Sequence, residues 1–386
     1  MEEWKEYKLG DVCNTISDTY RGNAQEVVLI NTSDVLEGKC LNHSKSANKD
    51  LKGQFKKTFQ KDDILYSEIR PANKRFAYVD FDPTDYIAST KLMVLRHNEL
   101  INPLYLFYIL KSKSVIEELQ MLAESRSGTF PQITFSELAN LTIKLPTLLE
   151  QEKILSILKS LDDKIELNRQ INDNLEQQAQ ALFKSWFVDF EPFKDGEFVE
   201  TELGMIPKGW SVSELGNVSE FRRGRTITQK DTICGAIPVI AGGLEPAYYH
   251  NRANTSAPVV TISASGANAG YTQILFEDVW ASDCSFVDST CKYLLFAYCF
   301  LSTNKKLLKH SQTGAAQPHV YAKDVNSFKL ALPTDLSFIE KFCKEISPFF
   351  NHIGVLRQEI AELSRLRDTL LPRLMSGELK INEIDC

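Results

Sequence analysis

Residues 145–186 read LPTLLEQEKILSILKSLDDKIELNRQINDNLEQQAQALFKSW. Pro146 is followed by Thr147 and, three residues later, by Glu150, a pattern that starts a helix with a capping box. Apolar or small residues then recur at alternating spacings of four and three, which is the heptad seam of a coiled coil. This seam consists of Ile154, Leu158, Leu161, Ile165, Asn168, Asn172, Leu175, Ala179, Leu182 and Trp186.

A second seam of the same kind lies near the end of the chain, after Pro333 and a candidate cap at Thr334. It consists of Phe342, Ile346, Phe349, Ile353, Leu356, Ile360, Leu363, Arg367, Leu370 and Leu374. Each helix of about 40 residues would be about 60 Å long. The residues expected to pair the helices or to bind partners are Ile154, Leu158, Leu161, Ile165, Leu175, Leu182, Ile346, Ile353, Leu356, Ile360, Leu363 and Leu370.

Asn168 and Asn172 interrupt the first seam. A buried asparagine usually lowers the stability of a coiled coil while fixing its register. The alternative is that this turn of the helix is solvated or faces a partner. The sequence leaves both interpretations open.

The chain repeats itself. Trp4 precedes Leu-Gly-Asp-Val at 9–12, and Trp210 precedes Leu-Gly-Asn-Val at 215–218, an offset of 206. The offset falls to 187 where 143–146 match 330–333, so the second globular segment is the shorter one. Within the long helices Arg169-Gln170 matches Arg357-Gln358. A globule followed by a helix, present twice, indicates a pseudo-two-fold internal duplication.

Both globular segments mix strand-like runs with an aromatic-rich helical run. The expected strands are Val27–Ile30, Phe76–Val79, Leu92–Leu95 and Leu141–Leu145, then Ile237–Ile240, Val259–Ile262 and Phe328–Leu332. The expected helical runs are Pro103–Gln120 and Lys292–His310.

The predicted fold class is therefore α/β (α+β), with two globular domains joined by two long antiparallel coiled-coil helices. The expected divisions are a first globular domain (1–146), a long helix (147–188), a linker (189–209), a second globular domain (210–333), a second long helix (334–376) and a tail (377–386).

Composition excludes several classes of protein. Hydrophobic residues make up 43% and charged residues 25%, as in a globular protein. The sequence has neither an apolar run of 18 residues nor a secretory signal, so we expect a cytoplasmic protein with no membrane partner. The eight cysteines form no Cys-x-x-Cys pair, and we expect them to be reduced and to bind no metal.

Most of the net charge of −7 lies outside the two globular segments. Residues 147–209 hold 7 basic and 13 acidic residues, a net of −6, whereas 1–146 hold 19 and 20 and 210–333 hold 11 and 9. The two globular segments are therefore near neutral, which leaves room for local basic faces.

Several motifs together resemble the specificity subunits of Type I restriction–modification systems. The junction reads SWFVDFEP at 185–192 and GMIPKGW at 204–210, and the chain closes with LPRLMSGEL at 371–379. Trp4 with LGDV at 9–12, and SGTFPQI at 127–133, are similar to the same family. The resemblance covers essentially the whole chain.

The resemblance implies a non-catalytic, sequence-specific DNA-binding subunit. Two target-recognition domains would each read one half of a split, asymmetric site in double-stranded DNA, and the helices would set the gap. Two modification subunits and two restriction subunits would bind the chain. S-adenosylmethionine, ATP and Mg would be held by those partners, and no cofactor by this chain.

Loops that recur at matching places in the two copies are the expected DNA-reading segments. Base edges are read mainly by Arg, Asn and Gln, and phosphates are bound by Lys, Arg, Ser, Thr and backbone amides. In the first copy the candidates are Ser67, Arg70, Asn73, Lys74, Arg75, Arg126, Ser127, Thr129 and Gln132. In the second they are Arg222, Arg223, Arg225, Ser263, Ser265, Asn268, Gln312, Thr313, Gln317 and His319.

Two other functions compete with this one. A two-headed coiled-coil spacer that recognises proteins would explain the helices but not the family motifs. A self-contained DNA methyltransferase would need a cofactor motif, and neither a P-loop nor a G-x-G-x-x-G turn is present. Asn102-Pro103-Leu104-Tyr105 approaches a methyltransferase motif, but it also fits the start of a helix.

Overall fold

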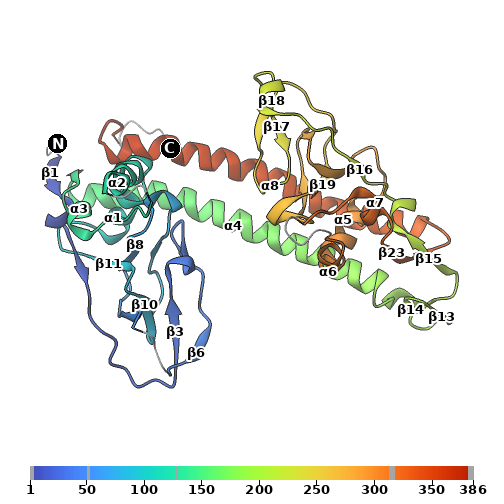
Figure 1. The fold of residues 1–386 in the computed structure, drawn as a ribbon, viewed down its shortest axis with the longest axis horizontal. Coiled ribbons are helices and arrows are strands. Elements are labelled where there is room, and N and C mark those ends of the chain that lie inside the picture. The colour runs from blue at the N-terminus through green and yellow to red at the C-terminus, as the bar shows by residue number, and fades with distance from the viewer. Residues whose placement is uncertain (1–3, 50–52, 127–128, 313–317, 381–386) are drawn as a thin grey trace. The chain divides into compact units, whose positions relative to one another are not determined.

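The computed structural model describes residues 4–49, 53–126, 129–312 and 318–380. The chain divides into two compact units, unit 1 (1–165 and 362–386) and unit 2 (166–361). Each unit combines a globular part with a segment of both long helices, α4 (Leu148–Phe187) and α8 (Ser337–Met375) (Figure 1). No helix in the described part of the chain is long and apolar enough to cross a membrane.

Unit 1 contains two four-stranded sheets. The first of them lies nearer to helices α1 (Pro103–Leu110), α2 (Lys113–Arg126) and α3 (Phe135–Ala139) than the second does (Figure 1). The first sheet is antiparallel, with the order β2 (Cys13–Ile16), β11 (Leu92–His97), β8 (Ile64–Ser67) and β9 (Phe76–Tyr78). The second has the order β6 (Lys45–Ala47), β3 (Glu26–Ile30), β10 (Tyr86–Ser89) and β7 (Phe55–Lys57), and its central pair is parallel. The remaining pairs are β1 (Lys5–Lys8) with β12 (Thr142–Leu145), and β4 (Val35–Leu36) with β5 (Lys39–Cys40).

Unit 2 repeats this topology with fewer strands. The antiparallel sheet has the order β16 (Arg222–Arg223), β22 (Cys284–Asp288), β19 (Val259–Ser263) and β20 (Thr272–Leu275). The second sheet is β18 (Tyr248–His250), β17 (Ile237–Ile240) and β21 (Trp280–Ala281), with a parallel β17–β21 pair. The pair β15 (Trp210–Glu214) with β23 (Lys329–Pro333) matches β1 with β12. The predicted internal duplication is confirmed in the order and direction of the strands.

The predicted helical runs are each broken into two helices. Unit 1 has α1 (Pro103–Leu110), α2 (Lys113–Arg126) and α3 (Phe135–Ala139), and unit 2 has α5 (Leu294–Thr303), α6 (Lys305–His310) and α7 (Ala322–Asn326). In unit 2 the break falls at Asn304, whose side-chain amide donates to the carbonyl oxygen of Phe300 at 2.9 Å. Such a local bond competes with the helix backbone, and composition alone did not reveal it.

The segments of α4 and α8 run antiparallel within each unit. In unit 2, Asn168 contacts Glu359 while Trp186 stacks on Phe338 with ring centroids 5.0 Å apart. In unit 1, Asp162 contacts Arg367, and Leu158 and Leu374 belong to one buried cluster. Every residue of the two predicted seams is buried or half-buried, so the heptad interpretation of both helices is confirmed.

The cores form where the helix seams meet the globules. In unit 1, Ile154 and Leu158 of α4 pack with Leu371 and Leu374 of α8 and with the apolar residues of α1. In unit 2 the ring of Phe187 lies 4.9 Å from Phe296 and 5.1 Å from Phe342, between centroids. Truncating an aromatic residue in such a core typically costs about 3–5 kcal/mol of stability.

The asparagine layer is buried. Asn168 is fully buried and Asn172 is 7% exposed, so this turn of the first seam is not solvated. The amide of Asn168 donates to a carboxylate oxygen of Glu359 at 2.9 Å. The side-chain oxygens of both asparagines are buried without a hydrogen-bond partner among the described residues.

One expectation about the start of α8 was wrong. Thr334 does not cap this helix, because its hydroxyl donates to the carbonyl oxygen of Gly209 at 2.7 Å, and Asp335 accepts from the backbone amide of Ser337 at 2.9 Å instead.

The segment 189–209, expected to be a linker, has regular structure of its own. It contains a 3-10 turn and the hairpin β13 (Phe198–Thr201)–β14 (Gly204–Pro207), and its aromatic residues pack around Trp210.

Candidate nucleic-acid interface

The first loop of unit 1 that the sequence predicts to read DNA follows strand β8. After Ser67 the chain turns through a 3-10 segment, Pro71–Asn73, and enters β9 at Phe76. Arg70 (φ 45°) and Lys74 (φ 53°) both adopt left-handed backbone conformations. Non-glycine residues held in this region cost about 1–3 kcal/mol each and persist only where surrounding structure imposes them.

A second loop imposes that conformation. The amide of Arg70 donates to the carbonyl oxygen of Pro131 at 3.1 Å, and the amide of Ile133 donates to that of Glu68 at 2.9 Å. Between these bonds Ile69 and Gln132 form an isolated antiparallel bridge. The two loops predicted from sequence therefore form one surface in unit 1.

Unit 2 contains the same arrangement. The amide of Gly266 donates to the carbonyl oxygen of Pro318 at 3.1 Å, and the amide of Val320 donates to that of Ala264 at 3.0 Å. The intervening bridge joins Ser265 to His319. Gly266, with φ of 80°, adopts the left-handed conformation that Arg70 adopts in unit 1, and glycine adopts it without strain.

Side chains on the unit 1 surface differ in how they are engaged. Arg70 is exposed and has no acidic partner among the described residues, and its guanidinium lies 3.5 Å from the carbonyl oxygen of Thr129. Lys74 pairs with Glu37 at 3.0 Å, and Arg126 pairs with Glu137 at 2.9 Å. Asn73 and Thr129 are exposed, Gln132 is half-buried, and Ser127 lies outside the described residues.

Glu137 links this surface to helix α3. Burial raises the pKa of Glu137, but hydrogen bonds from the amide and hydroxyl of Thr134 and the positive charge of Arg126 outweigh it, so its pKa lies below the ordinary value. The carboxylate is therefore ionised at neutral pH. It holds Arg126 on the surface by two contacts of 3.0 and 2.9 Å.

Three predicted contacts shape the loops instead of facing solvent. Ser67 is 2% exposed and its hydroxyl accepts from the amide of Ile69 at 3.1 Å. Ser263 is 4% exposed and donates to the carbonyl oxygen of Gly242 at 3.1 Å. The guanidinium of Arg75 donates to the carbonyl oxygen of Ser33 at 3.0 Å. Ser67 and Ser263 are too buried to touch DNA in this conformation, so those two expectations are corrected.

The three arginines of the basic cluster 222–225 differ in whether they contact other groups of the protein. Arg222 pairs with the buried carboxylate of Asp288 at 3.4 Å and lies over the ring of Phe286 at 5.2 Å. The side chain of Arg223 is exposed and has no hydrogen bond or ion pair to another described residue. Arg225 lies 5.9 Å from the ring centroid of Trp280. Arg222 and Arg225 contact groups of the protein, so Arg223 is the arginine of this cluster best placed to meet a ligand.

The other predicted residues of unit 2 line or support its loops. Ser265 donates to Asp283 at 2.5 Å, Asn268 lies 3.5 Å from the carbonyl oxygen of Gly242, and Gln312 donates to that of Ala269 at 2.8 Å. His319 stacks on Tyr321 with centroids 5.9 Å apart. Thr313 and Gln317 lie outside the described residues.

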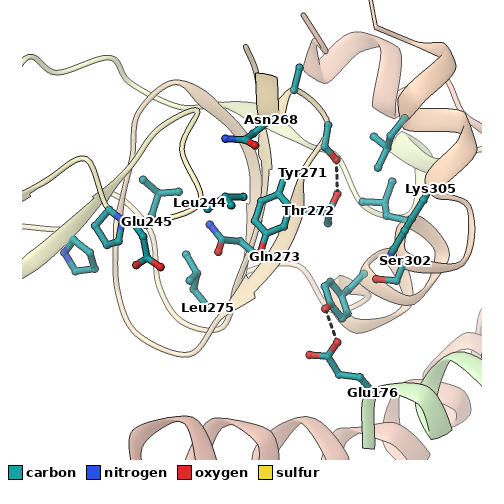
Figure 2. A pocket seen from close by; sticks show the side chains of 18 of the residues that line it. Glu176, Leu244, Glu245, Asn268, Tyr271, Thr272, Gln273, Leu275, Ser302 and Lys305 are labelled. Carbon is teal, nitrogen blue, oxygen red and sulfur yellow. Dashed lines mark hydrogen bonds between the residues drawn. The ribbon is translucent and has the colours of Figure 1, made fainter. Parts of the chain in front are cut away.

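A cleft of about 1260 Å³ borders the unit 2 loops. Figure 2 shows Asn268, Tyr271 and Gln273 along the β19–β20 hairpin, with Lys305 of α6 on the facing side. Sequence reasoning missed Tyr271, which is 43% exposed. An aromatic residue directly after a glycine-rich loop was the available signal.

Asn102, which begins the methyltransferase-like motif, caps helix α1. Its side-chain oxygen accepts from the amide of Leu104 at 3.0 Å, and Pro103 occupies the first turn. The helix-start interpretation of this segment is confirmed.

Comparison with known proteins identifies the class. The chain belongs to the family of Type I restriction modification DNA specificity domains, whose sequence model matches residues 1–177 and again residues 207–365. The two matches contain the two globular repeats described above.

Individual relatives support the same assignment. The Type I restriction enzyme HindI specificity subunit of Haemophilus influenzae is 33% identical over 98% of this chain and all of its own length. The MjaIX specificity subunit of Methanocaldococcus jannaschii is 30% identical, covering 72% of this chain and 70% of its own. The crystal structure of the Type I restriction–modification S subunit from M. genitalium has the same fold, with a TM-score of 0.59, 17% identity and coverage of 97% and 96%.

Proposed function

We propose that this chain is the non-catalytic subunit that reads a bipartite, asymmetric DNA target for a Type I restriction–modification complex. Residues 1–146 and 210–333 are the two target-recognition domains, each reading one half-site. Residues 147–188 and 334–376 are the spacer helices that set the unspecified gap. Residues 189–209 connect the halves, and 377–386 form the tail.

The repeated loop frame is the observation that carries this proposal. Two loops far apart in sequence are joined by the same pair of backbone hydrogen bonds in both units, through Arg70 and Pro131 in one and Gly266 and Pro318 in the other. A surface built twice on one backbone frame, with different side chains on each copy, suits a protein that reads two different half-sites. Arg70 and Arg223 add cationic groups that have no acidic partner among the described residues.

Each domain offers donors and acceptors suited to base edges. Arginine reads guanine and Asn or Gln reads adenine through paired hydrogen bonds in the major groove. We assign DNA contact in the first domain to Arg70, Asn73, Lys74, Arg126, Ser127, Thr129 and Gln132. In the second domain we assign it to Arg223, Arg225, Ser265, Asn268, Gln312, Thr313, Gln317 and His319. Arg75 and Arg222 bond groups of the protein itself, the carbonyl oxygen of Ser33 and the carboxylate of Asp288, and we assign them a structural role.

The partners follow from the same assignment. Two modification subunits and two restriction subunits would bind the helices and the junction. S-adenosylmethionine, ATP and Mg would belong to those subunits. The HindI and MjaIX relatives are themselves named as specificity subunits of Type I restriction enzymes, which supports such an assembly.

Methylome sequencing tests the proposal. Cells expressing the chain with its native modification subunit should acquire an N6-methyladenine motif with two defined parts and a fixed gap, and cells lacking the chain should not. An assembled complex that produces no chain-dependent motif would contradict the proposal and favour a two-headed spacer that recognises proteins.

A further inference from the structure

Helix α8 contains a glycine at the point where the unit 2 globule meets it. A Cβ built on Gly354 would lie 2.9 Å from Cδ1 and 3.0 Å from Cγ of Phe276, closer than side chains pack. Glycine inside a helix costs about 1 kcal/mol relative to alanine. The absent side chain leaves a socket on α8, and the ring of Phe276 occupies it.

Arg357, one turn further along the same helix, closes the socket. Its guanidinium lies 5.4 Å from the ring centroid of Phe276 and donates to the carbonyl oxygen of Ile274 at 2.6 Å. It also pairs with Glu176 of α4 at 2.9 Å. Glu176 in turn accepts from the hydroxyl of Tyr298 of α5 at 3.2 Å (Figure 2). One side chain therefore ties strand β20 to both long helices.

Strand β20 carries the recognition loop of unit 2. The loop, residues 264–271, joins β19 to β20, and the latched residues Ile274 and Phe276 lie just beyond it. Four backbone pairings join β19 to β20, from Val259–Leu275 to Ile262–Thr272, so a shift of β20 is transmitted to the loop. We call Gly354, Arg357, Phe276 and Ile274 the hairpin latch.

The duplicated position in α4 lacks this latch. Arg169, the counterpart of Arg357 in the repeat, is exposed and pairs with Glu166 of its own helix at 3.9 Å. Unit 1 is tied to its helices differently, through Asp162, which bonds Tyr108 at 2.5 Å and Arg367 at 2.8 Å. The latch is therefore a specific feature of unit 2 and not a property of the repeated helix.

We propose that the hairpin latch positions the second recognition domain, with Arg357 a specificity-determining positioning residue for the half-site that this domain reads. The inference rests on the proposed DNA-reading function. Arg357 acts through the carbonyl oxygen of Ile274 and the ring of Phe276, and it does not itself need to touch DNA. Loss of the latch should impair the reading of one half-site and leave the other unchanged.

The test compares Arg357→Met with Arg169→Met, each in the full chain assembled with its modification subunits. Methionine keeps an apolar stem and removes the charge and donors. Binding is measured to the intact target, to a duplex altered in the half-site of the second domain, and to one altered in the other half-site. For Arg357→Met, discrimination against the first altered duplex should fall about tenfold, since hydrogen bonds from a charged group are lost. Discrimination against the second should be unchanged, and Arg169→Met should match the parent in both.

Amide hydrogen exchange of the same complexes gives a readout that does not depend on DNA. Exchange across residues 259–276 should rise in Arg357→Met and not in Arg169→Met, because β20 loses its tie to the helices. Gly354→Ala provides a second variant, since alanine favours the helix while its methyl group displaces Phe276. It should reproduce the selective loss at one half-site.

Several outcomes would overturn the inference. An equal loss at both half-sites in Arg357→Met and Gly354→Ala would make the latch a general stabiliser only. Unchanged exchange and unchanged discrimination in Gly354→Ala would remove its positioning role even if Arg357→Met did not fold. A parent complex with no preference at either half-site would refute the proposed function and the latch with it, whereas a selective parent with unaffected variants would refute the latch alone.

Discussion

The backbone amide of Arg70 donates to the carbonyl oxygen of Pro131 at 3.1 Å, although 60 residues of chain separate them. This bond holds an arginine in a left-handed conformation on an exposed loop. In unit 2 the same bond joins Gly266 to Pro318. The first domain thus has a charged side chain at a position where the second has glycine, which adopts this conformation without strain. We infer that the strain at Arg70 is offset by what its side chain binds.

Two substitutions of Arg70 distinguish the reading of bases by its guanidinium from the effect of its positive charge. Arg70→Ala should weaken binding of the assembled complex to its target by about tenfold or more, because one two-pronged contact is worth roughly 1–3 kcal/mol. Arg70→Lys should restore affinity at low salt but not selectivity, since lysine cannot make the paired contact. Competition binding with target and altered duplexes measures both effects. Equal selectivity of Arg70→Lys and the parent would contradict a base-reading role.

The two arginines of β16, Arg222 and Arg223, should respond differently to substitution. Arg223→Ala is expected to lower DNA affinity and reduce the salt dependence of binding by about one phosphate contact, with no change in the melting temperature. Arg222→Ala should lower the melting temperature, because the buried carboxylate of Asp288, 7% exposed, would keep its hydrogen bonds from Thr290 but lose its cationic partner. Binding titrations across salt concentrations and thermal unfolding of both variants provide the comparison. Matching behaviour of the two variants would refute the division.

Acid should weaken the tie between the unit 1 globule and its helices. Burial raises the pKa of Asp162, but Lys111, Tyr108 and Arg367 outweigh it, so its pKa is lower than in the unfolded chain. A lowered pKa contributes stability above the unfolded value, about 3.9, which is lost as pH falls through the folded value. Asp162→Asn should therefore destabilise the protein by about 2 kcal/mol at pH 7. The difference from the parent should shrink as the pH falls below about 4.

Asp163→Asn is the matched control for that experiment. Asp163 is exposed and pairs only with Lys159 on the same helix among the described residues. Its replacement should change stability by less than about 0.5 kcal/mol at any pH. Denaturant unfolding as a function of pH measures both variants. A constant difference between Asp162→Asn and the parent from pH 7 to pH 3 would contradict the proposed ionisation.

The buried asparagine layer should reduce the stability of the helix pair. Asn172 is 7% exposed and its side-chain oxygen has no partner among the described residues, which costs about 1–3 kcal/mol. Asn172→Leu should therefore raise the melting temperature of unit 2. Asn174→Leu, at an exposed position on the same helix, should leave it unchanged. A lower melting temperature for Asn172→Leu would show that the amide is satisfied and stabilising.

The sequence alone predicted the repeating features of the fold. The heptad spacing identified α4 and α8, because a seam such as Ile154 to Trp186 depends only on local periodicity. The strand-like runs at 237–240 and 259–262 fell within β17 and β19 for the same reason. The helix break at Asn304 and the cap at Asp335 were missed, since both depend on single hydrogen bonds.

The sequence predicted which loops form the candidate site, but not which of their side chains are buried or bonded. Recurrence in both copies located the loops, but burial of Ser67 and Ser263 follows from contacts that spacing does not encode. The ion pair of Arg222 with Asp288 and the contact of Phe276 with Gly354 join residues 66 and 78 positions apart. Only tertiary structure brings such residues together.

The backbone bonds that join the two loops have a consequence for how the surface can vary. In each unit the shape of the proposed reading surface is set by backbone bonds such as those of Pro131 and Pro318, whereas the exposed side chains of Asn73 and Thr129 make no hydrogen bond to other described residues. Side chains at these exposed positions can therefore be exchanged without refolding the domain, and under the proposed function such an exchange would change the target. The groups that hold the domain together and the side chains proposed to read DNA are thus different ones.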